Sequence, residues 1–166
     1  MTEEASVQNI EIGMADMRIS SSPDVLITRG LGSCLGITLY DPIKKMGGLV
    51  HPMLPQIAEG RVKSNPYKFV DSAIDAMIDE LHAKGCKTFS LIAKVFGGGH
   101  MFSSIPASSV FNIGARNAEI VKKKFADSKI KIAVEDVGGN YGRTLFFNLE
   151  TGTVRVKTLF HGEREV

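Results

Sequence analysis

Short runs of apolar residues, bounded by Gly, Pro and Asp, occupy most of the chain and limit it to a β-rich fold. Runs in which apolar or β-branched residues alternate over a few positions are typical of strands. The turn residues Asp41-Pro42 separate two such runs and predict a β-hairpin. We predict strands at Met17–Ser20, Val25–Thr28, Leu35–Tyr40, Gly48–Met53, Thr88–Phe96, Ile130–Val137, Thr144–Leu149 and Thr153–Leu159.

Two segments have the period of a helix instead. Apolar residues recur on one helical face over 70–81, and Asn65-Pro66 offers a cap and a first residue for this helix. A second helix is predicted after Asn112, where apolar residues recur at helical spacing from Ile113 to Phe125. The polar segment Gln56–Ser64 has no period and is predicted to be a loop.

These elements predict one domain of the α/β class. A chain of 166 residues can bury roughly 70% of its unfolded surface, and no internal repeat or linker divides it. We predict mainly antiparallel strands with the two helices on one face of the sheet. Residues 1–166 form the single domain, with 1–16 as a candidate flexible N-terminus and 160–166 as a tail.

Composition excludes several classes of function. The formal net charge is only +2 and no basic patch carries aromatic residues, so we expect no nucleic-acid partner. No stretch approaches the ~18 apolar residues that cross a membrane, and the acidic first twenty residues do not resemble a signal peptide. We therefore expect a cytoplasmic protein without membrane insertion, whose two cysteines are reduced.

The stretch Thr28–Cys34 is a predicted strand that runs into a glycine-rich turn and ends at a cysteine. Gly30 and Gly32 allow backbone N–H groups to come close to a bound oxygen, as an oxyanion hole requires. The Gly32-Ser33 turn and the backbone of Cys34 are therefore candidate oxyanion donors.

His51 lies 17 residues after Cys34, across the predicted hairpin. If the arms pair in the simplest register, the two residues lie side by side. A free thiol has a pKa near 8.5, so only roughly 3% is thiolate at neutral pH, and an imidazole can raise that fraction and later protonate a leaving group. The pair predicts a nucleophile and its base. The alternative is structural, with Cys34 as a small buried hydrophobe and His51 as a hydrogen-bonded strand residue.

Other reactive side chains fit structural roles better. Cys86 follows the end of a predicted helix and is expected to pack in the core, whereas His100, in the glycine-rich loop after a strand, is a rival base. The cysteines and histidines lack the spacing of a zinc site, so we expect no metal. Gly97–Gly99 lacks the residues of a phosphate-binding loop and is predicted to be a turn.

Several sequence blocks, in order along most of the chain, resemble the CheD family of chemoreceptor glutamine deamidases. The early blocks are Thr28-Arg29-Gly30-Leu31-Gly32-Ser33-Cys34, Tyr40-Asp41-Pro42, Gly47-Gly48-Leu49-Val50-His51 and Leu54-Pro55. The later blocks are Ala93-Lys94-Val95-Phe96-Gly97-Gly98, Met101-Phe102, Ile113-Gly114-Ala115-Arg116-Asn117, Asp136-Val137-Gly138-Gly139 and Gly142-Arg143.

The resemblance implies a catalytic triad of Cys34, His51 and Thr28. It also implies a three-layer α/β/β sandwich and hydrolysis of selected glutamine side chains of methyl-accepting chemotaxis receptors to glutamate, with release of ammonia and without a cofactor. The family further implies the CheC phosphatase as a partner. Arg29 and Pro52 depart from the residue types frequent in the family, which affects the expected shape of the pocket.

The residues also allow two other functions. The chain could be a chemotaxis adaptor that mainly binds the phosphatase or the receptor, since Met101 and Phe102 are apolar residues on a glycine-rich loop. They could equally fold back onto the core. A small-molecule amidase that acts on free glutamine is the third hypothesis.

Overall fold

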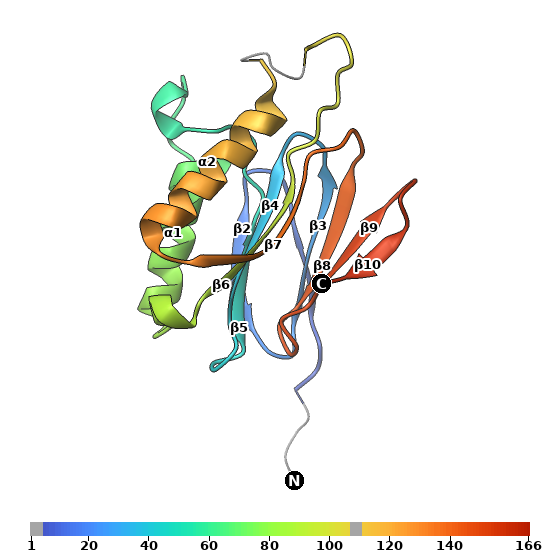
Figure 1. Cartoon of the computed structure of the whole chain (residues 1–166). Helices are drawn as coiled ribbons and strands as arrows, with labels where there is room; N and C mark the ends of the chain where they lie inside the picture. Colours follow the sequence, from blue (N-terminus) through green and yellow to red (C-terminus); the bar gives the residue numbers. More distant parts are fainter. Residues whose placement is uncertain (1–4, 107–110) are drawn as a thin grey trace.

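The computed structural model describes residues 5–106 and 111–166, and within them it places ten strands in two five-stranded sheets beside two α-helices (Figure 1). None of the helices in these residues is long and apolar enough to cross a membrane.

The first sheet has the order β1-β3-β8-β9-β10. Its strands are β1 (Asn9–Ile12), β3 (Val25–Leu31), β8 (Arg143–Asn148), β9 (Val154–Thr158) and β10 (Glu163–Glu165). β1 and β3 are parallel, and the other neighbours are antiparallel.

The second sheet has the order β2-β5-β4-β6-β7. Its strands are β2 (Met17–Ser21), β5 (Met46–Val50), β4 (Leu35–Asp41), β6 (Ile92–Gly97) and β7 (Lys131–Val137). Only β6 and β7 are parallel. β4 lies in the middle and every one of its residues is buried, as expected for a strand covered on both faces.

The helices α1 (Val70–Ala83) and α2 (Ile113–Ser128) cover the outer face of the second sheet, whose inner face packs on the first sheet (Figure 1). One apolar core lies between helices and sheet, and it includes Ile74, Met77, Val121 and Phe125. The other lies between the sheets, around Leu31, Leu145 and Phe147. The expected α/β/β sandwich with two main helices is confirmed.

Several element boundaries differ from the prediction. Asn65-Pro66 begins a short 3-10 helix, Pro66–Lys68, and α1 begins only at Val70. The run predicted as one strand from Thr88 is a 3-10 helix over Thr88–Ser90, followed by β6. The prediction also missed β1 and β10, which lie within the segments 1–16 and 160–166.

Candidate active site

The β4–β5 hairpin brings Cys34 and His51 to the same end of the second sheet. Ile37 pairs with Val50, and the N–H of Leu35 donates to the carbonyl of Pro52 at 3.1 Å. This register sets Gly36 opposite His51. Side chains two residues apart share one face of a strand, so the register turns Cys34 towards the face that carries the imidazole. Among the described residues, no hydrogen bond joins the Cys34 thiol to His51.

Gly36 leaves space for side chains of the first sheet to pack against β4. A Cβ atom built there would lie 2.5 Å from Cδ1 of Leu145 and 2.8 Å from Cδ1 of Leu31, both in the core between the sheets. The face of β4 that bears Gly36 therefore points at the first sheet, and the His51 ring, which is fully buried, extends towards β3.

Thr28 on β3 meets the ring there and fixes its tautomer. Its Oγ1 lies 2.8 Å from Nδ1 of His51 and 2.8 Å from the carbonyl oxygen of Ile12. A carbonyl only accepts, so the hydroxyl proton points to Ile12 and the hydroxyl oxygen accepts from the ring. Nδ1 of His51 therefore carries the proton. Nε2 is left as an acceptor, and it is buried without a hydrogen-bond partner among the described residues.

Burial keeps both reactive groups uncharged at neutral pH. It lowers the pKa of His51 from 6.5 to about 4. Burial also raises the pKa of the half-buried Cys34 thiol, an effect that its own backbone N–H partly opposes. The resting state is a thiol and a neutral imidazole, so this histidine is suited to take a proton during attack rather than to hold a preformed ion pair.

Backbone hydrogen bonds hold the turn before β4. Gly98 donates to the carbonyl of Cys34 at 2.9 Å and Gly99 donates to the carbonyl of Gly32 at 2.8 Å. The N–H of Gly32 itself donates to Gly30 at 3.1 Å, so this predicted oxyanion donor is already engaged. In the described part of the chain, the N–H groups of Ser33 and Cys34 have no acceptor beyond the Cys34 sulfur.

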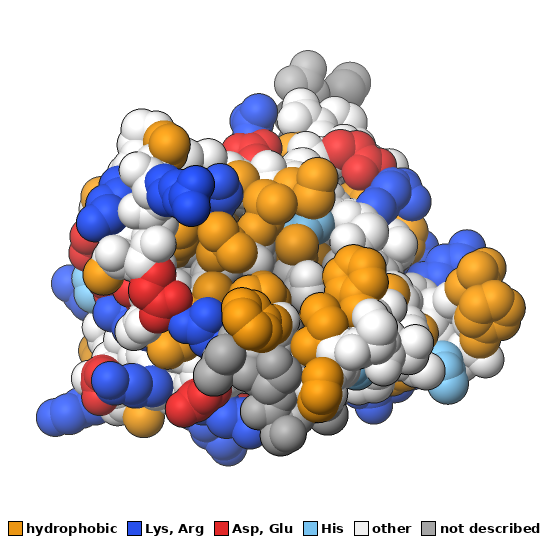
Figure 2. Space-filling model, turned by 90° about the horizontal axis from the view of Figure 1, so that it is seen from above, with side chains coloured by type: hydrophobic (Ala, Val, Ile, Leu, Met, Phe, Trp, Pro, Cys, Tyr) orange, Lys and Arg blue, Asp and Glu red, His pale blue; other side chains and the backbone are white. Residues whose placement is uncertain are grey.

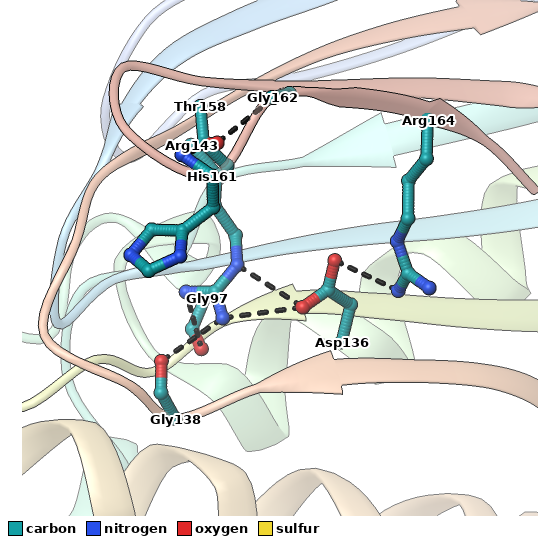
Figure 3. A network of polar contacts seen from close by, with 8 residues as sticks. All are labelled: Gly97, Asp136, Gly138, Arg143, Thr158, His161, Gly162 and Arg164. Carbon is teal, nitrogen blue, oxygen red and sulfur yellow. Dashed lines mark hydrogen bonds and ion pairs between the residues drawn. The ribbon is translucent and has the colours of Figure 1, made fainter.

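A buried arginine, Arg143, bonds to residues around the glycine loop 97–99, which contacts the turn before β4 (Figure 3). Arg143 is 2% exposed and donates to Oδ1 of Asp136, to the carbonyl of Gly138 at 2.9 Å and to that of Gly97 at 3.4 Å. Arg164 contacts the other oxygen of Asp136 at 2.9 Å. The network joins β8 of the first sheet to β6 and β7 of the second. The residue pattern did not single out Arg143, because a charged residue opening a strand is usually exposed.

Asn117 on α2 is a second functional candidate that the residue pattern missed. It is fully buried, and its Nδ2 donates to the carbonyls of Ser33 at 3.0 Å and Met53 at 3.1 Å. A signal was present, because Asn117 falls between Ile113 and Val121 on the apolar face of the predicted helix. A polar side chain at such a position needs partners inside the protein.

The loop predicted to bind partners lies beside the turn Gly32–Cys34. Met101 is 42% exposed and its side chain covers Gly32, where an added Cβ would lie 3.2 Å from Met101 Cγ. Phe102 is 65% exposed and lines a pocket of about 180 Å³ together with Ser33 and His100. Apolar side chains gather across the middle of the face seen in Figure 2, which views this end of the molecule.

The other cysteine has the packing role expected for it. Cys86 is buried in the core between helices and sheet, and its sulfur lies 3.9 Å from the sulfur of Met46.

Comparison with known proteins gives the family. The model of the family described as CheD chemotactic sensory transduction matches residues 53–158, which begin after Cys34 and His51. A "Probable chemoreceptor glutamine deamidase CheD" of Syntrophomonas wolfei is 45% identical over 155 residues, covering 93% of this chain and 96% of the relative. The "Chemoreceptor glutamine deamidase CheD" of Halalkalibacterium halodurans is 44% identical over 158 residues, or 95% and 98% of the two chains. A "Probable chemoreceptor glutamine deamidase CheD" of Clostridium botulinum is 42% identical over 160 residues. The chain therefore belongs to the CheD family.

Proposed function

We propose that this protein is a glutamine deamidase of methyl-accepting chemotaxis receptors, with Cys34 as nucleophile, His51 as base and Thr28 as the residue that orients the ring. The observation that carries the proposal is the 2.8 Å contact between Thr28 and Nδ1 of His51, which leaves Nε2 free as a buried base at the end of the strand pair that bears Cys34. The names of the relatives supply the substrate class.

The first half of the reaction forms a thioester. Nε2 of His51 accepts the thiol proton while the sulfur attacks the carboxamide carbon of the substrate glutamine. The oxyanion that develops is held by the N–H groups of Ser33 and Cys34, which have no other acceptor than the Cys34 sulfur among the described residues. The imidazolium then gives its proton to the departing nitrogen, and ammonia leaves.

The second half hydrolyses the thioester. His51 takes a proton from water, the resulting hydroxide adds to the thioester carbonyl, and the tetrahedral adduct expels the sulfur of Cys34. The imidazolium returns its proton to this sulfur, and the new carboxylic acid gives its own proton to water, so that glutamate remains in the receptor. Every other proton moves through Nε2, and the steps as written use no cofactor.

Thr28 contributes orientation without charge. Its hydroxyl accepts from the ring and donates to Ile12, which fixes the imidazole in the tautomer that the reaction needs. An uncharged partner stabilises the transient imidazolium less than a carboxylate does, so orientation is its main contribution.

Mass spectrometry of a receptor cytoplasmic fragment tests the proposal. Each conversion of an amide to an acid adds roughly 1 Da, and the acyl intermediate appears as a substrate adduct on the thiol. Cys34→Ala is expected to abolish both signals with the fold retained, whereas Cys86→Ala leaves turnover unchanged because that thiol lies in the other core. Undiminished ammonia release by Cys34→Ala would refute the nucleophile. Free glutamine assayed in parallel separates a protein deamidase from a small-molecule amidase.

Exposure of Phe102 favours a second function, the binding of a chemotaxis partner such as the CheC phosphatase or the receptor itself. A large aromatic side chain that is 65% exposed next to Met101 is the kind of residue that carries interface energy. Phe102→Ala is expected to weaken partner binding by at least about tenfold. Phe89→Ala is the control, since Phe89 is also a highly exposed phenylalanine but lies in the 3-10 helix before β6. Equal affinities for the two variants would discount this loop as the interface.

A further inference from the structure

We propose that Asn117 is a positioning residue that aims the backbone N–H of Cys34 at the oxyanion. The inference rests on the proposed function, because it concerns how the nucleophile turn stabilises the reaction. Asn117 lies on α2, outside the Cys34, His51 and Thr28 constellation, and it reaches that constellation through two backbone carbonyls.

The orientation of the amide follows from its partners. The carbonyl oxygens of Ser33 at 3.0 Å and Met53 at 3.1 Å lie within hydrogen-bond distance of one end of the amide, and both can only accept. The side-chain atom facing them must therefore be the NH₂ group, and each of its hydrogens has one acceptor. The amide thereby ties the residue before the nucleophile to the segment two residues after His51.

The bond to Ser33 fixes more than one atom. The carbonyl of Ser33 and the N–H of Cys34 belong to the same peptide unit, which is planar and trans, so its carbonyl and N–H point in opposite directions. Because Asn117 holds the carbonyl towards α2, the N–H of Cys34 points away from the helix. No protein group in the described residues accepts that N–H apart from the Cys34 sulfur, so it is available to a substrate oxygen.

The same bond also strengthens the donor. A carbonyl that accepts a hydrogen bond polarises its peptide unit and makes the N–H of that unit a better donor. The two loop N–H groups that contact this turn bond to the carbonyls on either side of Ser33, that of Gly99 to Gly32 and that of Gly98 to Cys34. Asn117 is the side chain that reaches the carbonyl between them.

The position carries an energetic penalty that the two donated hydrogen bonds offset. Oδ1 of Asn117 is buried without a partner among the described side chains and backbone groups, and the residue occupies the apolar face of α2. An aliphatic side chain there would remove the unpaired acceptor, but it would leave the carbonyls of Ser33 and Met53 without their donor. The arrangement is thus consistent with an amide retained for what it does to the nucleophile turn.

Two reactions of the same thiol test the role in Asn117→Ala. Deamidation of the receptor fragment needs the oxyanion donor, so kcat is expected to fall about 10- to 100-fold with KM unchanged. Alkylation of Cys34 by iodoacetamide displaces iodide at a tetrahedral carbon and forms no oxyanion. The alkylation rate is expected to change by less than about threefold, and the pH dependence of that rate is expected to stay the same. Peptide mapping assigns the alkylated cysteine.

Tyr40→Phe is the matched control, because it removes another buried hydrogen bond, from the Tyr40 hydroxyl to Leu149 at 2.8 Å, between the sheets and away from the turn. It should lower the thermal midpoint and leave kcat unchanged. If Asn117→Ala does not fold, Asn117→Leu carries the test, since leucine fills a similar volume and donates to neither carbonyl.

Three results would overturn the role of Asn117. Wild-type kcat in a folded Asn117 variant would show that the N–H needs no such support. Equal losses of deamidation and alkylation would show that the variant merely disorders the thiol. Either result leaves the proposed function standing, whereas full turnover by Cys34→Ala would remove the proposed function and the role of Asn117 with it.

Discussion

At the scale of single residues, the site depends on one hydrogen bond whose direction is known. The Thr28 hydroxyl has two neighbours, and the carbonyl of Ile12 takes its proton, so Nδ1 of His51 must donate. Without this acceptor the buried ring would have no reason to prefer the tautomer with a free Nε2.

Thr28→Val tests that dependence, because it keeps the shape of the side chain and removes the oxygen. We expect kcat to fall roughly 10- to 100-fold, since only part of the rings present the free nitrogen at Nε2. Thr38→Val is the control, because Thr38 is also buried in a strand but makes only a long bond of 3.4 Å to Lys94. A turnover number that drops equally in both variants would argue against a role in orienting the ring.

His51 also couples stability to pH. Its pKa of about 4 in the folded protein lies below the ordinary 6.5, so the unfolded chain binds the proton more readily. The stabilisation is therefore complete above pH 6.5 and is lost as the pH falls towards 4. It amounts to about 3 kcal/mol over that window. Urea unfolding at several pH values measures it.

The comparison variant for this titration is His51→Gln, which should lose the steep part of the pH dependence. His82→Gln should keep it, since His82 is exposed at the end of α1. Parallel curves for wild type and His51→Gln between pH 4 and 6.5 would contradict the buried, neutral histidine.

Residue types alone suggested Cys34 and His51, because the glycine-rich turn and the Asp41-Pro42 hairpin are local signals. Thr28 as a partner came from the family resemblance, since it lies on the other sheet and no local pattern places it opposite His51. Asn117 was visible only as an exception to the apolar face of a helix. Its acceptors are backbone carbonyls, which any sequence would supply.

At the scale of elements, the first turn of α2 closely approaches the glycine loop 97–99, which is hydrogen-bonded to the turn before β4. A Cβ atom on Gly114 would lie 2.3 Å from the carbonyl oxygen of Gly99 and 2.6 Å from that of Gly98. These are backbone atoms, and the same two residues donate to Gly32 and Cys34. The first turn of α2 can therefore approach the turn only because residue 114 has no side chain.

Gly114→Ala sets two effects against each other. Alanine favours a helix over glycine by about 1 kcal/mol, but here the methyl group would push on backbone that cannot rotate away. We expect the clash to prevail, so that the free energy of unfolding falls and kcat falls with it. Glu119→Ala on the exposed face of α2 is the control and should change neither. A stabilised, fully active Gly114→Ala variant would show that the loop has room for a methyl group at residue 114.

The elements that the sequence mispredicted have identifiable causes. Phe89 made Thr88–Phe96 look like one strand, yet its side chain is 86% exposed, and the backbone turns there as a 3-10 helix. Backbone bonds of Met53 and Leu54 to Lys68 delay the start of α1 past the Asn65-Pro66 cap. All of β10 is exposed, so no hydrophobic alternation marks it.

At the scale of the whole molecule, the two sheets are joined by a charged cluster as well as by an apolar core. Arg143 belongs to β8 in the first sheet, and Asp136, Gly97 and Gly138 lie at the ends of β6 and β7 in the second. A buried arginine that is bonded on several sides is stabilising only while all of its partners stay in place.

Arg143→Lys keeps the charge and loses the planar fork that reaches several acceptors. We expect a loss of about 2 kcal/mol in the free energy of unfolding, measured by urea denaturation. Arg155→Lys alters the Arg155–Glu163 pair at 2.7 Å, which is exposed to water, and should leave the midpoint unchanged. Equal effects of the two changes on the free energy of unfolding would mean that the hydrogen bonds of Arg143 do not stabilise the contact between the sheets.

The class of fold followed from the number of short apolar runs and the two helical stretches, since these patterns are local. The pairing of the sheets did not, because the partners of β1, β3 and β8 are far apart in the chain. The parallel contact of β6 with β7 depends on α2, which returns the chain to the same end of the sheet.

Thr28 and His51 lie in different sheets of the sandwich, so the geometry of their hydrogen bond depends on how the two sheets are placed relative to each other. A hydrogen bond needs its donor and acceptor within a narrow range of distance and angle, whereas burial of apolar surface has no preferred direction. Heating that shifts one layer relative to the other should therefore abolish turnover at a temperature where circular dichroism still shows a folded chain. In this protein, the loss of activity would therefore reveal a shift between the layers at a lower temperature than the unfolding transition does.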